Sequence, residues 1–129
     1  MNCLDGTLEA EGSNAIFRGR ARSEFGLRIN LGPLAENLKT YLGAKVVLGV
    51  RPEWLAYAET GSAPGLIEAV VEVVEPTGSD NFVLLQASGE TLMARFAPGV
   101  GTPGQQVGLV IDSNKTLLFD AMTEQRISR

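Results

Sequence analysis

The sequence predicts an all-β protein: a small β-barrel, or a pair of half-barrels, with one short helix. Fifteen glycines and six prolines are spread evenly along the 129 residues and divide the chain into short segments, which is typical of barrels and sandwiches. Within most of these segments apolar and polar residues alternate, as they do in strands with one buried face. Hydrophobic residues make up 44% of the chain, so one domain can form a core without disulfide or metal support.

Three strands are predicted in the first part of the chain, with a turn at 12–14 after the first. In the third of them, Leu27, Ile29 and Leu31 alternate with polar residues, and we expect these three side chains to face the core. The strands are predicted at 4–11, 15–18 and 27–31.

One helix is predicted, over residues 32–43. Pro33 suits the first helical position, where its missing N–H would have no partner, and Gly43 suits the left-handed conformation that ends a helix. An extended loop remains the alternative, because about ten residues of helix are marginal without packing. The apolar stripe of the helix consists of Leu34, Leu38, Tyr41 and Leu42.

The second part of the chain again consists of strands. The strand at 45–51 ends at Pro52, because proline cannot donate to a central ladder. A Gly/Ser/Pro-rich connector at 60–65 separates the two halves. Further strands are predicted at 66–75, 82–87, 91–96, 107–111 and 116–119, with the second and third of these forming a hairpin.

The long strand at 66–75 carries the only set of acidic residues that suggests acid–base chemistry. Glu68, Glu72 and Glu75 would need burial to shift their pKa values. Alternation along the strand explains them more simply, with Glu68 and Glu72 on a solvated face and apolar residues on the other. The apolar face is expected to consist of Ile67, Ala69, Val71 and Val73.

Composition and motifs argue against several classes of function. A net charge of −4 disfavours nucleic-acid binding, and the local cluster of arginines at 18–28 has glutamates beside it. With one cysteine, Cys3, and no histidine, a zinc finger and a Ser-His-Asp or Cys-His nucleophile are excluded. The one Lys-Thr pair, Lys115-Thr116, lacks the glycines of a phosphate-binding loop. We therefore expect no ATP binding, catalysis, metal or cofactor, and no run of apolar residues is long enough for a membrane span.

A corner is predicted where the strand at 45–51 ends. Pro52 fixes its own φ and pushes Arg51 into an extended conformation. The guanidinium of Arg51 can then reach a carboxylate with two hydrogen bonds, and Glu53 is either its partner or a turn cap. A purely structural corner is the alternative. Trp54 follows directly, as an aromatic anchor for a partner or as a core residue.

Two further segments complete a set of motifs: Glu75-Pro76-Thr77-Gly78-Ser79, and Leu117-Leu118-Phe119-Asp120 with Thr123-Glu124-Gln125-Arg126 behind it. Together with Met1-Asn2-Cys3-Leu4 and Gly49-Val50-Arg51-Pro52-Glu53, in this order, they resemble one family. It is the C-terminal regulatory region (TOBE, or transport-associated OB) of ATP-binding subunits from maltose- and glycerol-phosphate-type ABC importers.

The resemblance implies an OB-fold-like barrel of the MOP/TOBE type, with residues 1–129 as one regulatory domain and the ATPase domain absent from this chain. It also implies a non-catalytic regulatory and dimerisation role in the import of sugar or sugar-phosphate. The implied partners are a second copy, the ATPase domain, membrane permease subunits reached through it, and regulatory proteins, at the cytoplasmic side of the inner membrane. The candidate interaction or motif residues are Gly49, Arg51, Pro52, Glu53, Trp54, Glu75, Pro76, Gly78, Phe119 and Asp120, of which Trp54 stands where the family often has histidine.

An oxyanion-binding sensor barrel, related to molybdate-binding proteins, is the alternative. Such a protein would hold its ligand between protomers through backbone amides and Ser, Thr or Lys side chains. The sequence alone leaves both functions open.

Overall fold

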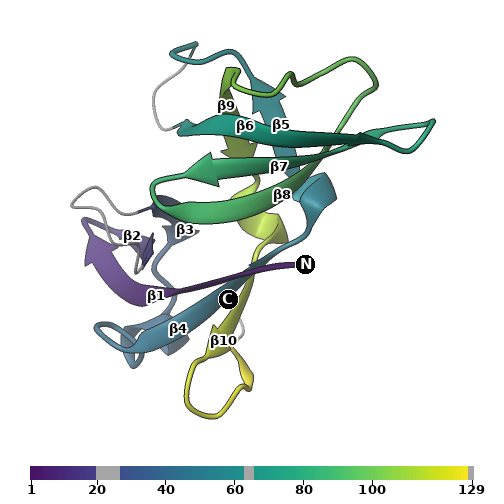
Figure 1. Ribbon diagram of the computed structural model, residues 1–129. Coiled ribbons are helices and arrows are strands. Elements are labelled where there is room, and N and C mark those ends of the chain that lie inside the picture. Colours follow the sequence, from purple (N-terminus) through teal and green to yellow (C-terminus); the bar gives the residue numbers. More distant parts are fainter. Residues whose placement is uncertain (20–26, 63–65, 128–129) are drawn as a thin grey trace.

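The computed structural model describes residues 1–19, 27–62 and 66–127. Within these ranges the protein consists of eleven strands in two sheets, one α-helix and two short 3-10 helices. Figure 1 shows the five-stranded sheet lying above the six-stranded one. The predicted all-β class with one short helix is therefore confirmed. No helix in the described ranges is long and apolar enough to cross a membrane.

The six-stranded sheet combines the start, the middle and the end of the chain. Its order is β11-β10-β4-β1-β2-β3, and every pairing is antiparallel. Leu48 lies at its centre, paired with Leu4 on one side and Leu118 on the other. All three are buried, so burial explains why the C-terminal segment returns to this sheet. The strands are β1 (Asn2–Glu11), β2 (Asn14–Gly19), β3 (Arg28–Pro33), β4 (Lys45–Val50), β10 (Leu117–Asp120) and β11 (Arg126–Ile127).

The five-stranded sheet curls into a half-barrel, in the order β5-β9-β6-β7-β8. Its two edge strands approach each other, and the ring of Tyr57 meets that of Phe96 edge-on, with centroids 5.8 Å apart. The predicted hairpin is β7–β8, closed by Ser88-Gly89. The strands are β5 (Leu55–Ala58), β6 (Ile67–Pro76), β7 (Asn81–Ala87), β8 (Glu90–Phe96) and β9 (Gln106–Ile111).

Buried side chains from both sheets form one continuous hydrophobic cluster. Leu27, Ile29 and Leu31 are buried as expected. The largest fully buried side chains include Phe17 from the first sheet and Leu85 from the second. The two sheets therefore share a core, which fixes their relative position.

The predicted helix over 32–43 is wrong in its extent, because α1 covers only Glu36–Lys39. Strand β3 continues through Pro33, which pairs with Asn14, and the N–H of Leu34 donates to the carbonyl of Ser13. The residues that would have formed the first turn of the helix are therefore part of the sheet instead. Of the predicted apolar stripe, Leu38 is buried and Leu34 and Tyr41 pack half-buried against the core, but Leu42 is 38% exposed.

Two strands were not predicted, and one predicted face is wrong. Strand β5 has four residues and β11 has two, too short for an alternating pattern to stand out. In β6 a bulge between Val71 and Val73 shifts the register, so Val73 is 45% exposed and Val74 packs against the core instead. Of the predicted connector at 60–65, residues 63–65 lie outside the described residues.

Candidate functional site

The Arg51–Trp54 corner carries the chain from one sheet to the other. Arg51 is extended, with φ −72° and ψ 147°, and Pro52 opens the 3-10 helix η1 (Pro52–Trp54). The N–H of Trp54 donates to the carbonyl of Arg51 at 2.9 Å, and β5 begins directly afterwards. The extended conformation predicted for Arg51 and the structural corner are both found.

The guanidinium of Arg51 lies over the ring of Trp54, 5.4 Å from its centroid. The ion pair considered between Arg51 and Glu53 is absent from the described contacts, and both side chains are exposed. Stacking on an indole face is a favourable alternative for a guanidinium. Trp54 is half-buried and packs against the core, so the guanidinium of Arg51 stacks on a ring that the core holds in place.

Gly49 and Phe119 meet although they are far apart in the sequence. A Cβ on Gly49 would lie 3.1 Å from Sδ of Met1 and 3.3 Å from Cε2 of Phe119. Because Gly49 has no side chain, the side chains of Met1 and Phe119 can both lie over β4 at this position. This contact brings together residues from the first, second and last of the predicted motifs.

Asp120 shapes the turn between β10 and β11. Its Oδ1 accepts hydrogen bonds from the N–H groups of Met122 at 2.8 Å and Thr123 at 3.2 Å. Its backbone N–H donates to Gln125 at 2.9 Å, and its carbonyl accepts from Glu124 at 2.8 Å. Asp120 is thus a turn-forming residue in this structure.

The Glu75–Gly78 motif forms the end of the β6–β7 hairpin, which projects at the upper right of Figure 1. Glu75 pairs with Phe82, and Pro76 with Asn81. Gly78 has φ 98°, so the turn uses the left-handed region that glycine tolerates. The ten predicted residues therefore divide between the two sheets and do not converge on one pocket.

Asn2, which belongs to the Met1-Asn2-Cys3-Leu4 motif, has a role that the sequence did not predict. Its Nδ2 donates to the carbonyl of Val50 at 3.0 Å and to that of Met93 at 2.8 Å, and its Oδ1 accepts from the N–H of Met93 at 2.8 Å. One side chain therefore joins β4 of the first sheet to β8 of the second. No sequence signal marks this contact, because nothing in the spacing shows that residue 93 lies beside residue 2.

Asn2→Ala is expected to destabilise the protein by about 1 kcal/mol, because the half-buried Asn2 side chain loses its hydrogen bonds to Val50 and Met93. Asn2→Asp keeps the acceptor for the N–H of Met93 but places a carboxylate oxygen against the carbonyls of Val50 and Met93, so it should destabilise the protein at least as much as alanine does. Urea denaturation measures both, with Asn114→Ala, at an exposed position, as the control. Equal stability of Asn2→Ala and the control would contradict the role of this side chain.

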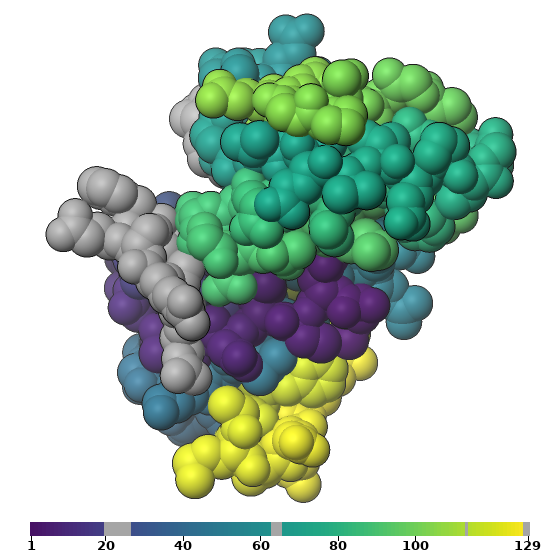
Figure 2. All heavy atoms as spheres, viewed as in Figure 1, coloured from purple at the N-terminus to yellow at the C-terminus, as the bar shows by residue number. Residues whose placement is uncertain are grey.

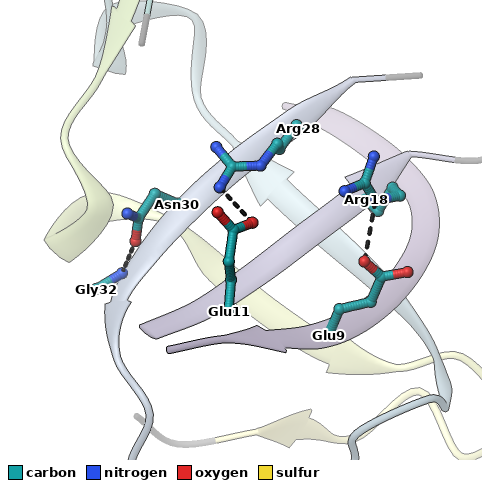
Figure 3. Close-up of polar contacts among 6 residues, drawn as sticks. All are labelled: Glu9, Glu11, Arg18, Arg28, Asn30 and Gly32. Atoms are coloured by element: carbon teal, nitrogen blue, oxygen red, sulfur yellow. Dashed lines mark hydrogen bonds and ion pairs between the residues drawn. The ribbon is translucent and has the colours of Figure 1, made fainter. Parts of the chain in front are cut away.

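Two arginines of the local cluster, Arg18 and Arg28, are paired with neighbouring carboxylates, as their position near glutamates suggested, whereas Arg20 and Arg22 lie outside the described residues. Arg18 Nε lies 2.9 Å from Glu9 Oε2, and Arg28 Nη2 lies 2.5 Å from Glu11 Oε2 (Figure 3). The hydrogen bond from Arg28 holds the pKa of Glu11 below its usual value. These described arginines form a solvated, charge-balanced strand face.

Glu90, at the start of β8, has the opposite shift. Burial raises its pKa, and the carboxylate of Asp5 raises it further. Because the pKa of Glu90 is higher in the folded state than in the unfolded state, the protonated carboxyl contributes to the free energy of unfolding below the unfolded pKa. This contribution is lost as pH rises through the folded pKa. Glu90→Gln should therefore gain stability over wild type as pH rises from 4 to 7, and the gain should be small because solvent screens this partly exposed carboxyl.

Thermal melts across this pH range test the Glu90 prediction. Glu11→Gln is the matched control with the opposite sign. The lowered pKa of Glu11 stabilises above its unfolded pKa, and that contribution is lost as pH falls. Parallel pH profiles for the two variants would contradict at least one of the two assignments.

No group of three or more potential metal-ligating residues occurs among the described residues. A cavity of about 380 Å³ opens between β3 and the β6–β9 pair. The cation that lines it, Arg28, is already bound to Glu11, and most of the other lining side chains are aliphatic.

The two sheets, their shared core and the corner between them define an OB-type β-barrel module. Family models agree: the MalK OB fold domain matches residues 1–55 and the TOBE domain matches residues 48–119. The chain belongs to the TOBE domain family. The two matches overlap at the corner described above.

Relatives of known function are ATP-binding proteins of importers. The chain is 30% identical over 128 residues to the sn-glycerol-3-phosphate import ATP-binding protein UgpC of Escherichia coli, covering 98% of this chain and 33% of the relative. It is 37% identical over 92 residues to the trehalose/maltose import ATP-binding protein MalK of Thermococcus litoralis, covering 67% and 25%. The chain thus spans a third or less of the length of these relatives, and it matches their C-terminal regions.

A solved structure has the same fold. The cytoplasmic molybdate-binding protein ModG, with molybdate bound, superposes with a TM-score of 0.65 over 91% of this chain and 94% of that one. The two sequences are 19% identical, so the likeness is one of fold.

Proposed function

We propose that this chain is a non-catalytic regulatory module of the ATP-binding subunit of an ABC importer for sugars or sugar-phosphates. In this role it pairs with a second copy and stabilises the dimer of ATPase domains. Those domains hydrolyse ATP and contact the membrane permease subunits. The module accordingly works on the cytoplasmic side, peripheral to the inner membrane, where regulatory proteins have access to it.

The observation that carries the proposal is the tandem match of two family models, meeting where the chain crosses between sheets. Residues 48–55 belong to both matches, and they contain the whole Arg51–Trp54 corner. The relatives that match 98% and 67% of the chain are importer ATP-binding proteins. The substrate class follows those relatives, whose names specify glycerol-phosphate and trehalose or maltose.

Binding calorimetry with the purified chain tests the non-catalytic role. Titration with Mg-ATP should give no saturable heat up to millimolar concentration, because the sequence lacks a phosphate-binding loop. Saturable binding at micromolar ATP would contradict the proposal.

Titration with molybdate, tungstate and sulfate separates the regulatory module from an oxyanion sensor. The proposal predicts no binding in any of the three titrations. The cavity beside β3 supports this expectation, because its cation, Arg28, is already paired with Glu11. Micromolar binding of one oxyanion would favour the sensor instead.

A further inference from the structure

The outer face of the five-stranded sheet carries an apolar stripe across β6, β7 and β8. Val73 pairs with Leu84, and Leu84 with Met93, so the three side chains form one row. Val73 is 45% and Met93 40% exposed. The bulge in β6 creates this row, because it turns Val73 outward.

Charged residues flank the stripe in the next row. Glu75 pairs with Phe82, and Phe82 with Arg95, which places an acid on β6 and a base on β8 with an aromatic ring between them. The guanidinium of Arg95 lies over this ring, 5.8 Å from its centroid, and its Nε binds Asp80 at 2.8 Å. Arg95 keeps further donors available, and Glu75 makes no ion pair with a described residue.

The face is open and slightly hollowed. Val73, Glu75, Phe82, Leu84 and Met93 line a depression of about 80 Å³. In the upper half of Figure 2 the teal and green atoms of β6, β7 and β8 form the molecular surface, and the purple and yellow strands of the other sheet do not cover them.

We infer that this face, the β6–β8 stripe, is the surface through which the chain pairs with a second copy. The charge pattern on this face favours a second copy of the chain as the partner. A two-fold axis along β7 places β6 of each copy opposite β8 of the other. Glu75 then faces Arg95 of the second copy in both directions, and Val73 faces Met93 across a central pair of Leu84 side chains.

Both predicted corners border the stripe, which supports the same face. Glu75 lies in the stripe's flanking row and begins the hairpin turn. On the other side, Asn2 joins the carbonyl of Val50, directly before the Arg51 corner, to the backbone of Met93. The inference rests on the proposed function, in which the chain works beside a second copy.

Charge reversal tests this geometry with an internal rescue. Glu75→Arg alone would place two arginines opposite each other at both contacts, and Arg95→Glu alone would place two glutamates there. An equal mixture of the two variants restores both attractive contacts in the mixed dimer. Sedimentation from micromolar to millimolar concentration should show a wild-type dimer and an affinity at least about tenfold lower for each single variant. The mixture should then recover association.

Val110→Arg is the matched control, because Val110 is 44% exposed on β9 of the same sheet and lies outside the stripe. It should associate as wild type does, and circular dichroism should show every variant folded. A wild-type dimer that neither charge reversal weakens, or a mixture without rescue, would overturn this face while leaving self-association intact. A wild type that stays monomeric throughout would overturn the face and the pairing. The ATP and oxyanion titrations test the rest of the proposed function independently.

Discussion

Phe17→Ala is expected to destabilise the fold by about 3–5 kcal/mol, the range for removing a buried aromatic side chain. Phe17 is fully buried in β2, and its ring lies directly over Gly6 of β1. Removing it opens a cavity where β1 and β2 pack into the shared core, so the surrounding side chains have little freedom to close it. Urea denaturation gives the free energy of unfolding for the variant and the wild type.

Met122→Ala is the control for Phe17→Ala. Its side chain is 90% exposed in the turn after β10, so the substitution should change stability by less than about 0.5 kcal/mol. A cost below about 2 kcal/mol for Phe17→Ala would show that this part of the core collapses easily, contrary to the packing described.

Gly6→Val is expected to have the second largest effect, about 3 kcal/mol at the upper end for overpacking a core. A Cβ at this position would lie 2.4 Å from the carbonyl oxygen of Arg18 and 2.6 Å from the ring of Phe17. The carbonyl belongs to the paired strand β2, so it cannot move without breaking the ladder. The loss of strand pairing should appear as a lower melting temperature and a weaker β signal in circular dichroism.

Ala10→Val on the same strand is the matched control, because Ala10 is exposed and valine has a higher β-propensity than alanine. Its stability should stay within about 0.5 kcal/mol of wild type. Similar losses for the two valine variants would mean that close approach at Gly6 is not the cause.

The sequence predicted the strands where alternation is strict and extends over several residues. Residues 27–31 and the β7–β8 hairpin show this, because period-two burial leaves a direct mark on residue type. The helix was overextended because Pro33 and Gly32 fit a helix start as well as a strand end. Pairing of Pro33 with Asn14 decides between the two, and that contact is tertiary.

The candidate surface was only partly predictable. The corners at Arg51 and Glu75 were found from proline and glycine chemistry, which is local. The stacking of Arg51 on Trp54, the contact of Gly49 with Phe119, and the bridge from Asn2 to Met93 all join residues that only the fold brings together. The outward Val73 depends on a bulge that strand alternation does not reveal.

Transport by a grafted subunit tests the central claim most directly. In the Escherichia coli relative, residues 1–129 replace the matched third of the ATP-binding protein, and uptake of sn-glycerol-3-phosphate is measured against the same subunit lacking that region. The account predicts that the graft restores uptake and that the same graft with Phe17→Ala does not. A folded graft that leaves uptake and ATP hydrolysis at the level of the truncated subunit would contradict it.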